Sequence, residues 1–229
     1  CDWSSDVCSS DLLATLAAAQ SYPSKPIRYI VPFPAGGGTD IVARALAPKL
    51  LETSGIQIVI DNRGGGGTVV GADIAAHSPP DGYTAFMGTN TSHAINPNLA
   101  VKLPYDAVRD FQPVTRIALI PYMLTVHPSL PAKNVKELIA LAKARPDQLN
   151  FASSGNGTPG HLAGLMLNDA AGIRTTHVPY KGAAPAVTAM VSGETQFTFS
   201  SLTSTLPMVK ADRLRVIARS EEHTSELQS

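Results

Sequence analysis

Residues Val31–Asp40 read VPFPAGGGTD and place three consecutive glycines between an apolar run and a helical pattern. The apolar run, Ile27–Phe33, is typical of a buried strand, and the spacing of apolar residues over Thr39–Thr53 predicts a helix. Glycine lets the backbone approach a ligand closely, and the free N–H groups at the start of a helix attract anions. We therefore expect a strand, loop and helix whose loop binds an anion.

Strand and helix patterns alternate along the rest of the chain, which predicts an α/β fold with parallel strands and helices on the sheet faces. Before Asn90 the further expected elements are a strand at Gln57–Asp61, a helix at Val69–Ala76 and a strand at Tyr83–Met87. Beyond Pro113 they are strand-like crossing segments at Arg116–Val126, helices at Val135–Lys143, His161–Ala171 and Ala184–Val191, and strands at Leu149–Ala152, Thr176–Pro179, Thr195–Phe199 and Leu214–Ala218.

The stretch between these two series, Asn90–Pro113, is rich in proline and asparagine and breaks the alternation. A connection of this length marks either a functional loop or a crossing between domains. The two series have a similar plan, so we predict two lobes that face each other, at 22–103 and 104–218. The second range is expected to end with the start of a crossing back to the first lobe.

The second series contains a counterpart of the opening stretch. Leu149–His161 reads LNFASSGNGTPGH, again a strand, a loop of small residues and a helix start. Each lobe thus offers an anion-binding loop. AGGGTD lacks the spacing of a dinucleotide motif, and SGNGTPG lacks the lysine and hydroxyl residue of a phosphate loop. The residues alone leave small-anion binding, nucleotide chemistry and a structural role of the glycines open; for Gly64–Gly67 a flexible turn is favoured over a ligand contact.

Both ends of the chain have a different origin from the rest. The first twelve residues, CDWSSDVCSSDL, and the last eleven, RSEEHTSELQS, are translations of opposite strands of one DNA sequence, which is identified as a sequencing-library adapter. Unrelated protein termini would not share such a sequence, so we expect 1–12 and 219–229 to be adapter-derived scars. The adjacent 13–21 begins LATLAAA and is typical of the end of a secretory signal peptide; an ordinary helical turn is the alternative.

These expected scars change what the composition implies. The chain has 18 basic and 18 acidic residues, of which 17 and 12 lie outside the scars. This mild, dispersed positive charge suits an anionic ligand and does not indicate a nucleic-acid surface. Both cysteines, Cys1 and Cys8, fall in the first scar, and the histidines outside the scars lack metal-ligand spacing. We predict no metal or other cofactor, and no segment after 13–21 has the roughly 20 apolar residues of a membrane span.

Seven segments then carry a family resemblance. In chain order they are PFPAGGGTDIVAR, PDGYTAFMGTN, HAINPNL, LPYDAVRDFQPV, ASSGNGTPGHLAG, HVPYKGAAPA and MVKADRLRVIA, between about Tyr22 and Ala218. Together they resemble the tripartite tricarboxylate transporter receptors, the TctC or Bug family. The resemblance implies an α/β, two-lobed periplasmic-binding-protein (Venus-flytrap) fold without catalytic activity. It further implies a periplasmic receptor, expected to be a monomer, that captures a small carboxylate for membrane permease subunits; a di- or tricarboxylate, an aromatic acid and an acidic amino acid all remain open.

The resemblance also implies where the ligand binds. In the family, the loop after the first strand and the facing loop of the second lobe hold the ligand carboxylate through backbone N–H groups, small hydroxyl side chains and ordered water. The corresponding first-lobe positions are Phe33, Ala35, Gly36, Gly37, Gly38, Thr39 and Asp40, with Thr89 further along. The corresponding second-lobe positions are Ser153, Ser154, Gly155, Asn156, Gly157, Thr158, His161, Tyr180, Lys181 and Ser200.

Some of these positions have a second interpretation. Asp40 falls in the first turn of the expected helix, where an acid stabilises the helix end without any ligand. His161 opens the second helix and is either an anion donor or a structural histidine. Ser153 and His161 resemble a nucleophile and its base only superficially, because no third group orients the histidine and no strained elbow surrounds the serine. For Lys181 a surface role is favoured.

Two features depart from the family pattern. Many relatives read Phe-Asp-Asn-Leu where this chain has Phe199–Leu202, FSSL, so a carboxylate near the cleft is missing and the ligand preference stays open. The family continues with strands and helices that complete the first lobe, whereas here the expected scar begins at Arg219. We therefore expect an incomplete first lobe with exposed apolar surface. The competing interpretations are an α/β enzyme acting on a phosphorylated or nucleotide substrate, and a fragment without function.

Overall fold

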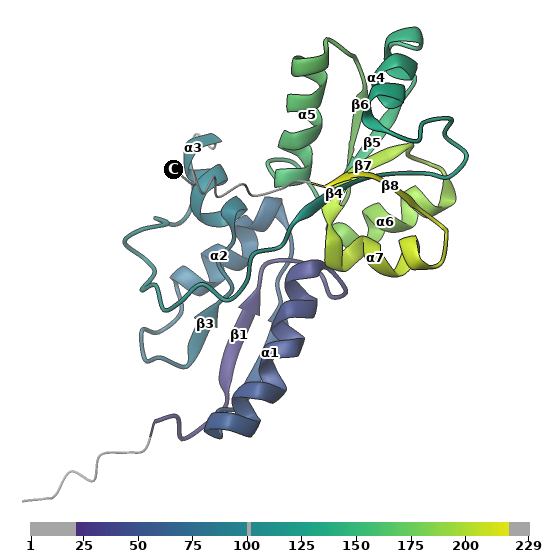
Figure 1. Ribbon diagram of the computed structural model, residues 1–229. Helices are drawn as coiled ribbons and strands as arrows, with labels where there is room; N and C mark the ends of the chain where they lie inside the picture. The colour runs from purple at the N-terminus through teal and green to yellow at the C-terminus, as the bar shows by residue number, and fades with distance from the viewer. Residues whose placement is uncertain (1–21, 100–101, 220–229) are drawn as a thin grey trace, which may run out of the picture.

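The computed structural model describes residues 22–99 and 102–219. Two β-sheets organise these residues, one of three strands and one of five. Helices accompany each sheet, and the two α/β units lie at opposite ends of the molecule in Figure 1. The expected adapter-derived scars and the expected end of a signal peptide lie outside the described residues, at 1–12, 13–21 and 220–229.

The first sheet has the order β2-β1-β3, and all its strands are parallel. Its strands are β1 (Ile27–Val31), β2 (Ile58–Asn62) and β3 (Thr84–Phe86). Its helices are α1 (Gly38–Ser54) and α2 (Val69–Ala76), and the short 3-10 turn η1 (Gly66–Thr68) precedes α2. Alternate residues of a strand share one face of the sheet, so Tyr29 and Val31 of β1 pack together with Ala43 of α1 in a buried core.

The connection after β3 is more ordered than its sequence predicts. It contains the π-helical turn η2 (Thr91–Ile95) and the short helix α3 (Asn96–Leu99). The side chain of Asn96 donates to the carbonyl oxygen of Gly67 (2.8 Å). The buried hydroxyl of Tyr105 donates to the backbone carbonyl oxygen of Ser92 (2.8 Å). Side-chain bonds to backbone carbonyls thus hold this proline-rich stretch against the first lobe.

The second sheet has the order β6-β5-β7-β4-β8. Its strands are β4 (Tyr122–Val126), β5 (Asn150–Ser153), β6 (Thr176–Pro179), β7 (Phe197–Ser201) and β8 (Arg215–Arg219). Its helices are α4 (Val135–Ala144), α5 (Pro159–Ala171), α6 (Ala183–Ser192) and α7 (Leu202–Lys210). Strand β5 pairs in parallel with β6 and with the central strand β7, whereas β4 pairs antiparallel with β7 and β8.

The core of the second lobe is built from large apolar side chains that exclude water completely. Phe151, Phe197, Val126 and Leu138 each have no exposed surface. Burying one such side chain stabilises the fold by about 1.5–3 kcal/mol. Two apolar side chains of the first lobe, Val59 and Val70, are by contrast 52% and 44% exposed.

Beyond the connection after β3, the sequence prediction differs from the structure in helix α7 and in the direction of strand pairing. Helix α7 was not predicted, because its sequence LTSTLPMVK combines weak helix formers with Pro207 inside the helix. The alternation predicts parallel pairing, which is correct for the first sheet and wrong for β4 and β8 in the second. Strand direction depends on how the chain enters the sheet, and the crossing from the first lobe brings β4 in from the opposite end. The bounds of α2 and β6 are those predicted.

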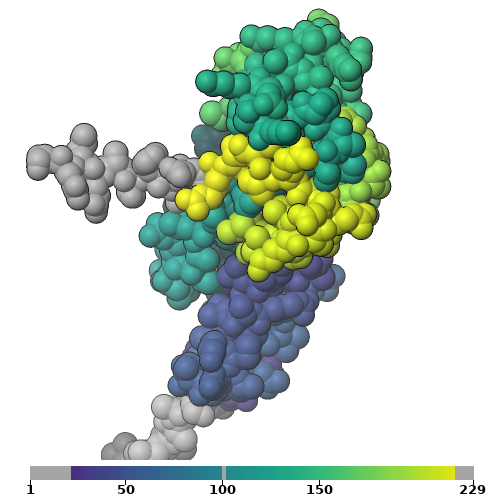
Figure 2. Space-filling view, turned by 45° about the vertical axis from the view of Figure 1, so that its right-hand side comes forward, coloured from purple at the N-terminus to yellow at the C-terminus, as the bar shows by residue number. Residues whose placement is uncertain are grey.

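The two lobes meet where β1 and β7 end. Helix α1 contacts α7, and the space-filling view shows first-lobe residues directly below the residues of the second lobe that follow β7 (Figure 2). In open α/β sheets, ligands bind beyond the carboxyl ends of the strands. Among the described residues, none of the helices combines the length and the apolar character that crossing a bilayer requires.

Candidate functional site

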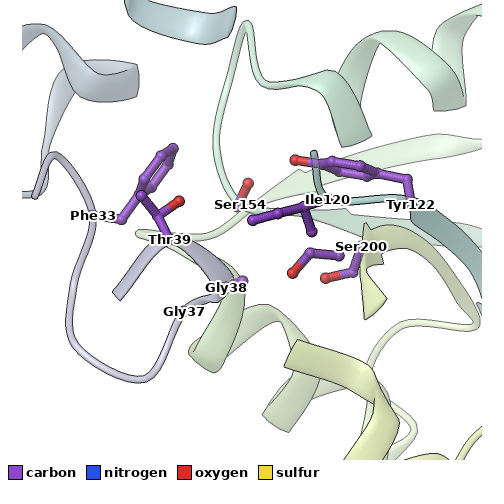
Figure 3. A pocket seen from close by; sticks show the side chains of 10 residues that line it. Phe33, Gly37, Gly38, Thr39, Ile120, Tyr122, Ser154 and Ser200 are labelled. Carbon is purple, nitrogen blue, oxygen red and sulfur yellow. The ribbon is translucent and has the colours of Figure 1, made fainter. Parts of the chain in front are cut away.

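A pocket lies at this junction and takes its walls from both lobes (Figure 3). The first lobe contributes Phe33, Gly37, Gly38 and Thr39. The segment entering the second sheet contributes Ile120 and Tyr122, and the second lobe contributes Ser154, Ala183, Ser200 and Ser201. The sequence predicts six of these ten positions: Phe33, Gly37, Gly38, Thr39, Ser154 and Ser200.

Three helices begin at the pocket. Gly38 is the first residue of α1 and Ala183 the first of α6, while Ser201 directly precedes α7. None of the three residues before these helices forms a side-chain cap. The first N–H groups of a helix have no partner within the helix, and its N-terminus carries a partial positive charge. The positive ends of three helices therefore lie at the pocket. Of their first N–H groups, that of Leu202 on α7 donates to the carbonyl oxygen of Pro121 (3.0 Å).

A glycine is required where α1 approaches α7. A Cβ atom on Gly38 would lie 2.6 Å from the hydroxyl of Ser201 and 2.5 Å from that of Thr203. No side chain fits at such distances, so Gly38 allows the two helix starts to approach each other. For this one of the three opening glycines, the bare backbone thus serves the contact between the lobes.

The carboxylate of Asp40 turns away from the pocket and holds its own loop. It accepts hydrogen bonds from the backbone N–H of Gly36 (2.9 Å), from Nε of Arg44 (2.9 Å) and from the amide of Asn62 (2.9 Å). Burial alone would raise the pKa of Asp40, but these hydrogen bonds outweigh burial and hold the pKa below its usual value. Asp40 is only 2% exposed, and its bonding corresponds to the structural interpretation of this residue.

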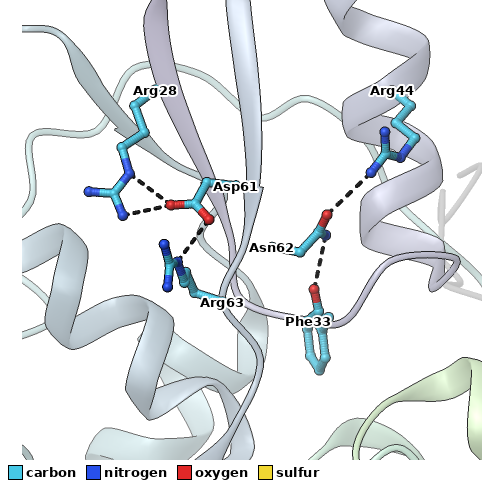
Figure 4. Close-up of polar contacts among 6 residues, drawn as sticks. All are labelled: Arg28, Phe33, Arg44, Asp61, Asn62 and Arg63. Atoms are coloured by element: carbon cyan, nitrogen blue, oxygen red, sulfur yellow. Dashed lines mark hydrogen bonds and ion pairs between the residues drawn. The ribbon is translucent and has the colours of Figure 1, made fainter.

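The neighbouring polar contacts attach the same loop to β2. The amide of Asn62 also donates to the carbonyl oxygen of Phe33 (3.0 Å), and Arg44 donates to the Asn62 side-chain oxygen (3.2 Å), as Figure 4 shows. Beside them, Asp61 pairs with Arg28 (2.6 Å) and Arg63 (2.8 Å). The charged side chains of this region are paired with one another and do not line the pocket.

The lining of the pocket carries no charged side chain. Its polar groups are the hydroxyls of threonine, serine and tyrosine, and its apolar part consists of Phe33, Ile120 and the ring of Tyr122. Burial raises the pKa of Tyr122, so this phenol stays neutral at any physiological pH. Any charge on a ligand would thus face backbone dipoles and hydroxyl groups.

The loop of the second lobe is held by two histidines. The hydroxyl of Ser153 lies 2.6 Å from Nε2 of His177, and it also bonds to the N–H and the carbonyl oxygen of Gly155 (both 3.1 Å). Nδ1 of His161 accepts from the backbone N–H of Gly157 (3.2 Å). Ser153 is 1% exposed and pairs with His177 rather than with His161. The likeness of Ser153 and His161 to a nucleophile and its base is therefore superficial in the structure as well.

The other predicted positions are not part of the pocket wall. Thr158 donates to Gly155 within the same loop (2.7 Å), and Thr89 accepts and donates in a turn with Ser92. The hydroxyl of Tyr180 donates to Glu194 (2.8 Å), and Lys181 is exposed. The remaining predicted positions outside the wall are Ala35, Gly36, Gly155 and Asn156. Their role in ligand binding stays a prediction.

Four lining residues were missed by the sequence analysis. Ser201 belongs to the segment FSSL and Ala183 to the segment VPYKGAAPA. Both segments contain predicted site residues, so their neighbouring positions could have been included in the prediction. Ile120 and Tyr122 lie in the segment that enters the second sheet, and nothing in their sequence marks them. Only the path of the chain between the lobes brings them to the pocket.

Comparison with known proteins agrees with this arrangement. A model of the tripartite tricarboxylate transporter family receptor, TctC, matches residues 42–227. The chain belongs to this receptor family. A family member encoded in the tcbD–tcbE intergenic region of Pseudomonas sp. (strain P51) is 37% identical over 197 residues, which cover 86% of this chain and 58% of that protein. BugT of Bordetella pertussis is 34% identical over 207 residues, which cover 90% of this chain and 64% of BugT.

Solved structures of receptors share the fold. Rpa4515 of R. palustris, solved with adipate, superimposes with a TM-score of 0.85 at 37% identity over 88% of this chain and 67% of that chain. MatC of Rhodopseudomonas palustris, solved with malate, gives 0.81 at 29% identity over 88% and 68%. The periplasmic binding protein BugD gives 0.83 at 31% identity. The predicted two-lobed periplasmic-binding-protein fold is thereby confirmed, and the family consists of solute-binding proteins.

Proposed function

We propose that this protein is a periplasmic receptor that captures a small carboxylate and delivers it to the permease subunits of a tripartite tricarboxylate transporter. The observation that carries the proposal is the meeting of three helix N-termini without side-chain caps at a pocket whose lining has no charged side chain. The chain spans 58% of the Pseudomonas relative and 64% of BugT, so activity, substrate and partner are all part of the proposal.

The physics of the site favours an anion of carboxylate size. A hydrogen bond from an N–H group to a charged acceptor contributes about 1.5–3 kcal/mol, and each helix N-terminus adds roughly 0.3–1 kcal/mol. A carboxylate has two oxygens that accept from neighbouring donors, and hydroxyls such as those of Thr39 and Ser200 supply further donors. Neutralisation by a lysine or arginine is not needed under these conditions.

The same lining favours acids without an amino group. An ammonium group buried without an opposite charge is strongly disfavoured, and the two serines of Phe199–Leu202 offer none. The apolar side of the pocket, Phe33, Ile120 and Tyr122, suits the methylene chain or ring of an organic acid. Adipate and malate, the ligands named for two structural relatives, are acids of this kind.

The experiment is ligand-dependent thermal unfolding, followed by calorimetric titration of every compound that shifts the transition. The compounds are adipate, malate, benzoate and glutamate, with ATP and NAD as probes of the competing enzyme interpretation. We expect an upward shift with a carboxylate that lacks an amine, because a ligand at 100 times its Kd stabilises the native state by about 2.7 kcal/mol. A shift with ATP or NAD alone would contradict the proposal.

Variants locate the binding. Ser200→Ala and Ser154→Ala each remove one hydroxyl from the pocket wall, so the Kd for the responding carboxylate should rise about three- to tenfold, in the range of one net hydrogen bond. Ser54→Ala removes an exposed hydroxyl at the end of α1 and is the matched control. Equal Kd values for all three variants would place the ligand elsewhere.

A further inference from the structure

Two histidines of the second lobe form a stack beside the pocket loop. The rings of His161 on α5 and His177 on β6 lie 4.0 Å apart between centroids at an interplanar angle of 22°. The other stacked neighbour of His177 is the ring of Phe151 on β5, at 4.8 Å and 28°. The central imidazole is therefore enclosed between an aromatic hydrocarbon and a second imidazole.

Close packing of α5 brings the two imidazoles together. A Cβ atom on Gly164 would lie 2.3 Å from the ring of Phe151, so only glycine lets the helix approach β5 at this point. His161 is one helical turn earlier and on the same face of α5. The parallel register between β5 and β6 places Phe151 opposite His177. Tertiary packing, rather than any local motif, creates the stack.

The hydrogen bonds of the pair determine where its protons are. Nδ1 of His161 accepts from Gly157 N–H (3.2 Å), so this nitrogen carries no proton and the ring is neutral. The hydroxyl of Ser153 accepts from Gly155 N–H and donates to the Gly155 carbonyl oxygen. The hydroxyl can accept one more hydrogen bond, and Nε2 of His177 lies 2.6 Å away. A neutral His177 ring donates this bond when its proton is on Nε2.

These bonds reach both ends of the loop that follows β5. Ser153 and Gly155 are at its beginning, and Gly157 is near its end, where α5 starts. Ser154, between the two attachments, lines the pocket. A Cβ on Gly67 of the first lobe would lie 2.8 Å from the Asn156 carbonyl oxygen, so the loop also touches the opposite lobe. The shape of the loop thus affects both the pocket and the contact between the lobes.

We propose that His161 and His177 are positioning residues for ligand binding: as neutral rings they hold the loop Ser154–Thr158 in its binding shape, and proton uptake by the pair releases it. Protonation of His161 at Nδ1 replaces the acceptor of Gly157 N–H by a second donor, so that this bond cannot form. A charge on both stacked rings also makes them repel each other at 4.0 Å. The proposal rests on the proposed function only for its effect on a ligand; its effect on the loop is independent of it.

Within 22–99 and 102–219, no carboxylate shifts the pKa of either histidine of the pair. β5 presents the Phe151 ring and the Ser153 hydroxyl, α5 presents His161, β6 presents His177, and the loop presents the N–H groups of Gly155 and Gly157. Among the described residues, His161 is the one titratable group whose charge, once it is protonated, acts on the pKa of His177. Burial lowers the pKa of His161, and burial together with the His161 charge lowers the pKa of His177 to about 4. Both rings are therefore neutral at pH 7.5.

The first test uses the protein without ligand. Histidine ring and backbone amide resonances are followed by NMR between pH 8 and pH 4. We expect the Gly157 amide to shift with the same midpoint as the His161 ring, because protonation removes its acceptor. Gly55, whose N–H donates to Leu51 at the end of α1, is the control amide and should not follow this midpoint. A Gly157 amide that does not respond as His161 titrates would overturn the proposal.

The second test is the affinity for adipate at pH 7.5 and pH 5.0 by calorimetry. For the unmodified protein we expect the Kd to be higher at pH 5.0 beyond any effect of adipate protonation, by up to about tenfold for each pKa unit by which ligand binding lowers the pKa of His161. His161→Asn keeps an acceptor at the bonded position and His177→Gln keeps a donor, but neither new side chain titrates. In the double variant, the ratio of the Kd at pH 5.0 to the Kd at pH 7.5 should therefore fall to the part caused by adipate protonation. His127→Asn, on the loop after β4 with its ring bonded to Ser129, is the matched control and should keep the full ratio.

The outcomes separate the two proposals. If malate and adipate both fail to bind at pH 7.5, the assignment of this ligand class fails, while the NMR titration still decides whether the histidines hold the loop. If adipate binds and the double variant keeps the same ratio of Kd values as the unmodified protein, the positioning role is contradicted and the function is not. The ratio does not depend on the absolute affinity of each variant.

Discussion

The two glycine loops that face the pocket look alike in sequence but are held in different ways. In the first lobe, the buried carboxylate of Asp40 accepts three hydrogen bonds from its own loop, from α1 and from β2. In the second lobe, neutral imidazoles bond to the loop after β5. A carboxylate with a lowered pKa keeps its charge throughout the neutral range, whereas His161 and His177, whose pKa values burial lowers below the usual 6.5, gain charge only at acidic pH. Similar backbone shapes therefore differ in their response to acid.

The largest expected effect is that of removing the first anchor. Asp40→Ala leaves Gly36 N–H and the Asn62 amide without their buried acceptor, and we expect a loss of about 2–3 kcal/mol in the free energy of unfolding. Urea denaturation monitored by circular dichroism measures it. Asp81→Ala, which removes an exposed partner of Lys25, is the control and should cost less than about 1 kcal/mol. Equal losses in both variants would show that Asp40 is no anchor.

A larger residue at Gly164 should lower the free energy of unfolding by a similar or slightly smaller amount than Asp40→Ala. In Gly164→Ala the new methyl group meets the Phe151 ring, so α5 must move away, at a cost of about 1–3 kcal/mol. The same movement separates His161 from His177, and the Gly157 amide resonance should shift even at pH 7.5. Ala170→Ser adds one atom on the exposed face of α5 and should change neither quantity. A Gly164→Ala protein of unchanged stability would contradict the packing described for α5.

Stability should depend on pH through the second loop. The pKa of His177 is lowered in the folded protein to about 4, so between pH 6.5 and pH 4 the unfolded chain binds more protons than the folded one. The free energy of unfolding should therefore be constant above pH 6.5 and fall below it. After allowance for the solvent screening of these half-buried rings, the loss is on the order of 1 kcal/mol. In the double variant His161→Asn/His177→Gln, the histidine part of this pH dependence should disappear, while the part caused by carboxylates remains at lower pH. The same pH dependence of unfolding in the variant and the unmodified protein would contradict the assignment of this part to the histidines.

The smallest effect is expected at Tyr180. Its hydroxyl donates to Glu194 on the surface, and burial together with this carboxylate raises the pKa of Tyr180 to about 12. Tyr180→Phe should lower the free energy of unfolding by less than about 1 kcal/mol, the typical net value of one hydrogen bond. It should leave the Kd for adipate unchanged in calorimetry. A tenfold rise in Kd would instead support the ligand-binding role predicted for Tyr180 from the sequence.

The local pattern was sufficient for most of the elements. Apolar runs and helical spacing predict the strands and helices on either side of both glycine loops, and α2 and β6 have the predicted bounds. These signals arise within a few residues, where side-chain periodicity and glycine conformation decide the structure. The family motifs add the fold and the region of the site, because they recur in order along nearly the whole chain.

Contacts between distant residues were decided by the tertiary structure alone. Ser153 bonds to His177, and the pair comes together through the register of β5 and β6. Ile120 and Tyr122 reach the pocket only because the chain crosses between the lobes before β4. By itself the sequence determined which residues form strand, loop and helix, because those preferences are local. Which side chain meets which was decided by the packing of α5, α7 and the two sheets, since a hydrogen-bond partner depends on distances in space that no spacing along the chain encodes.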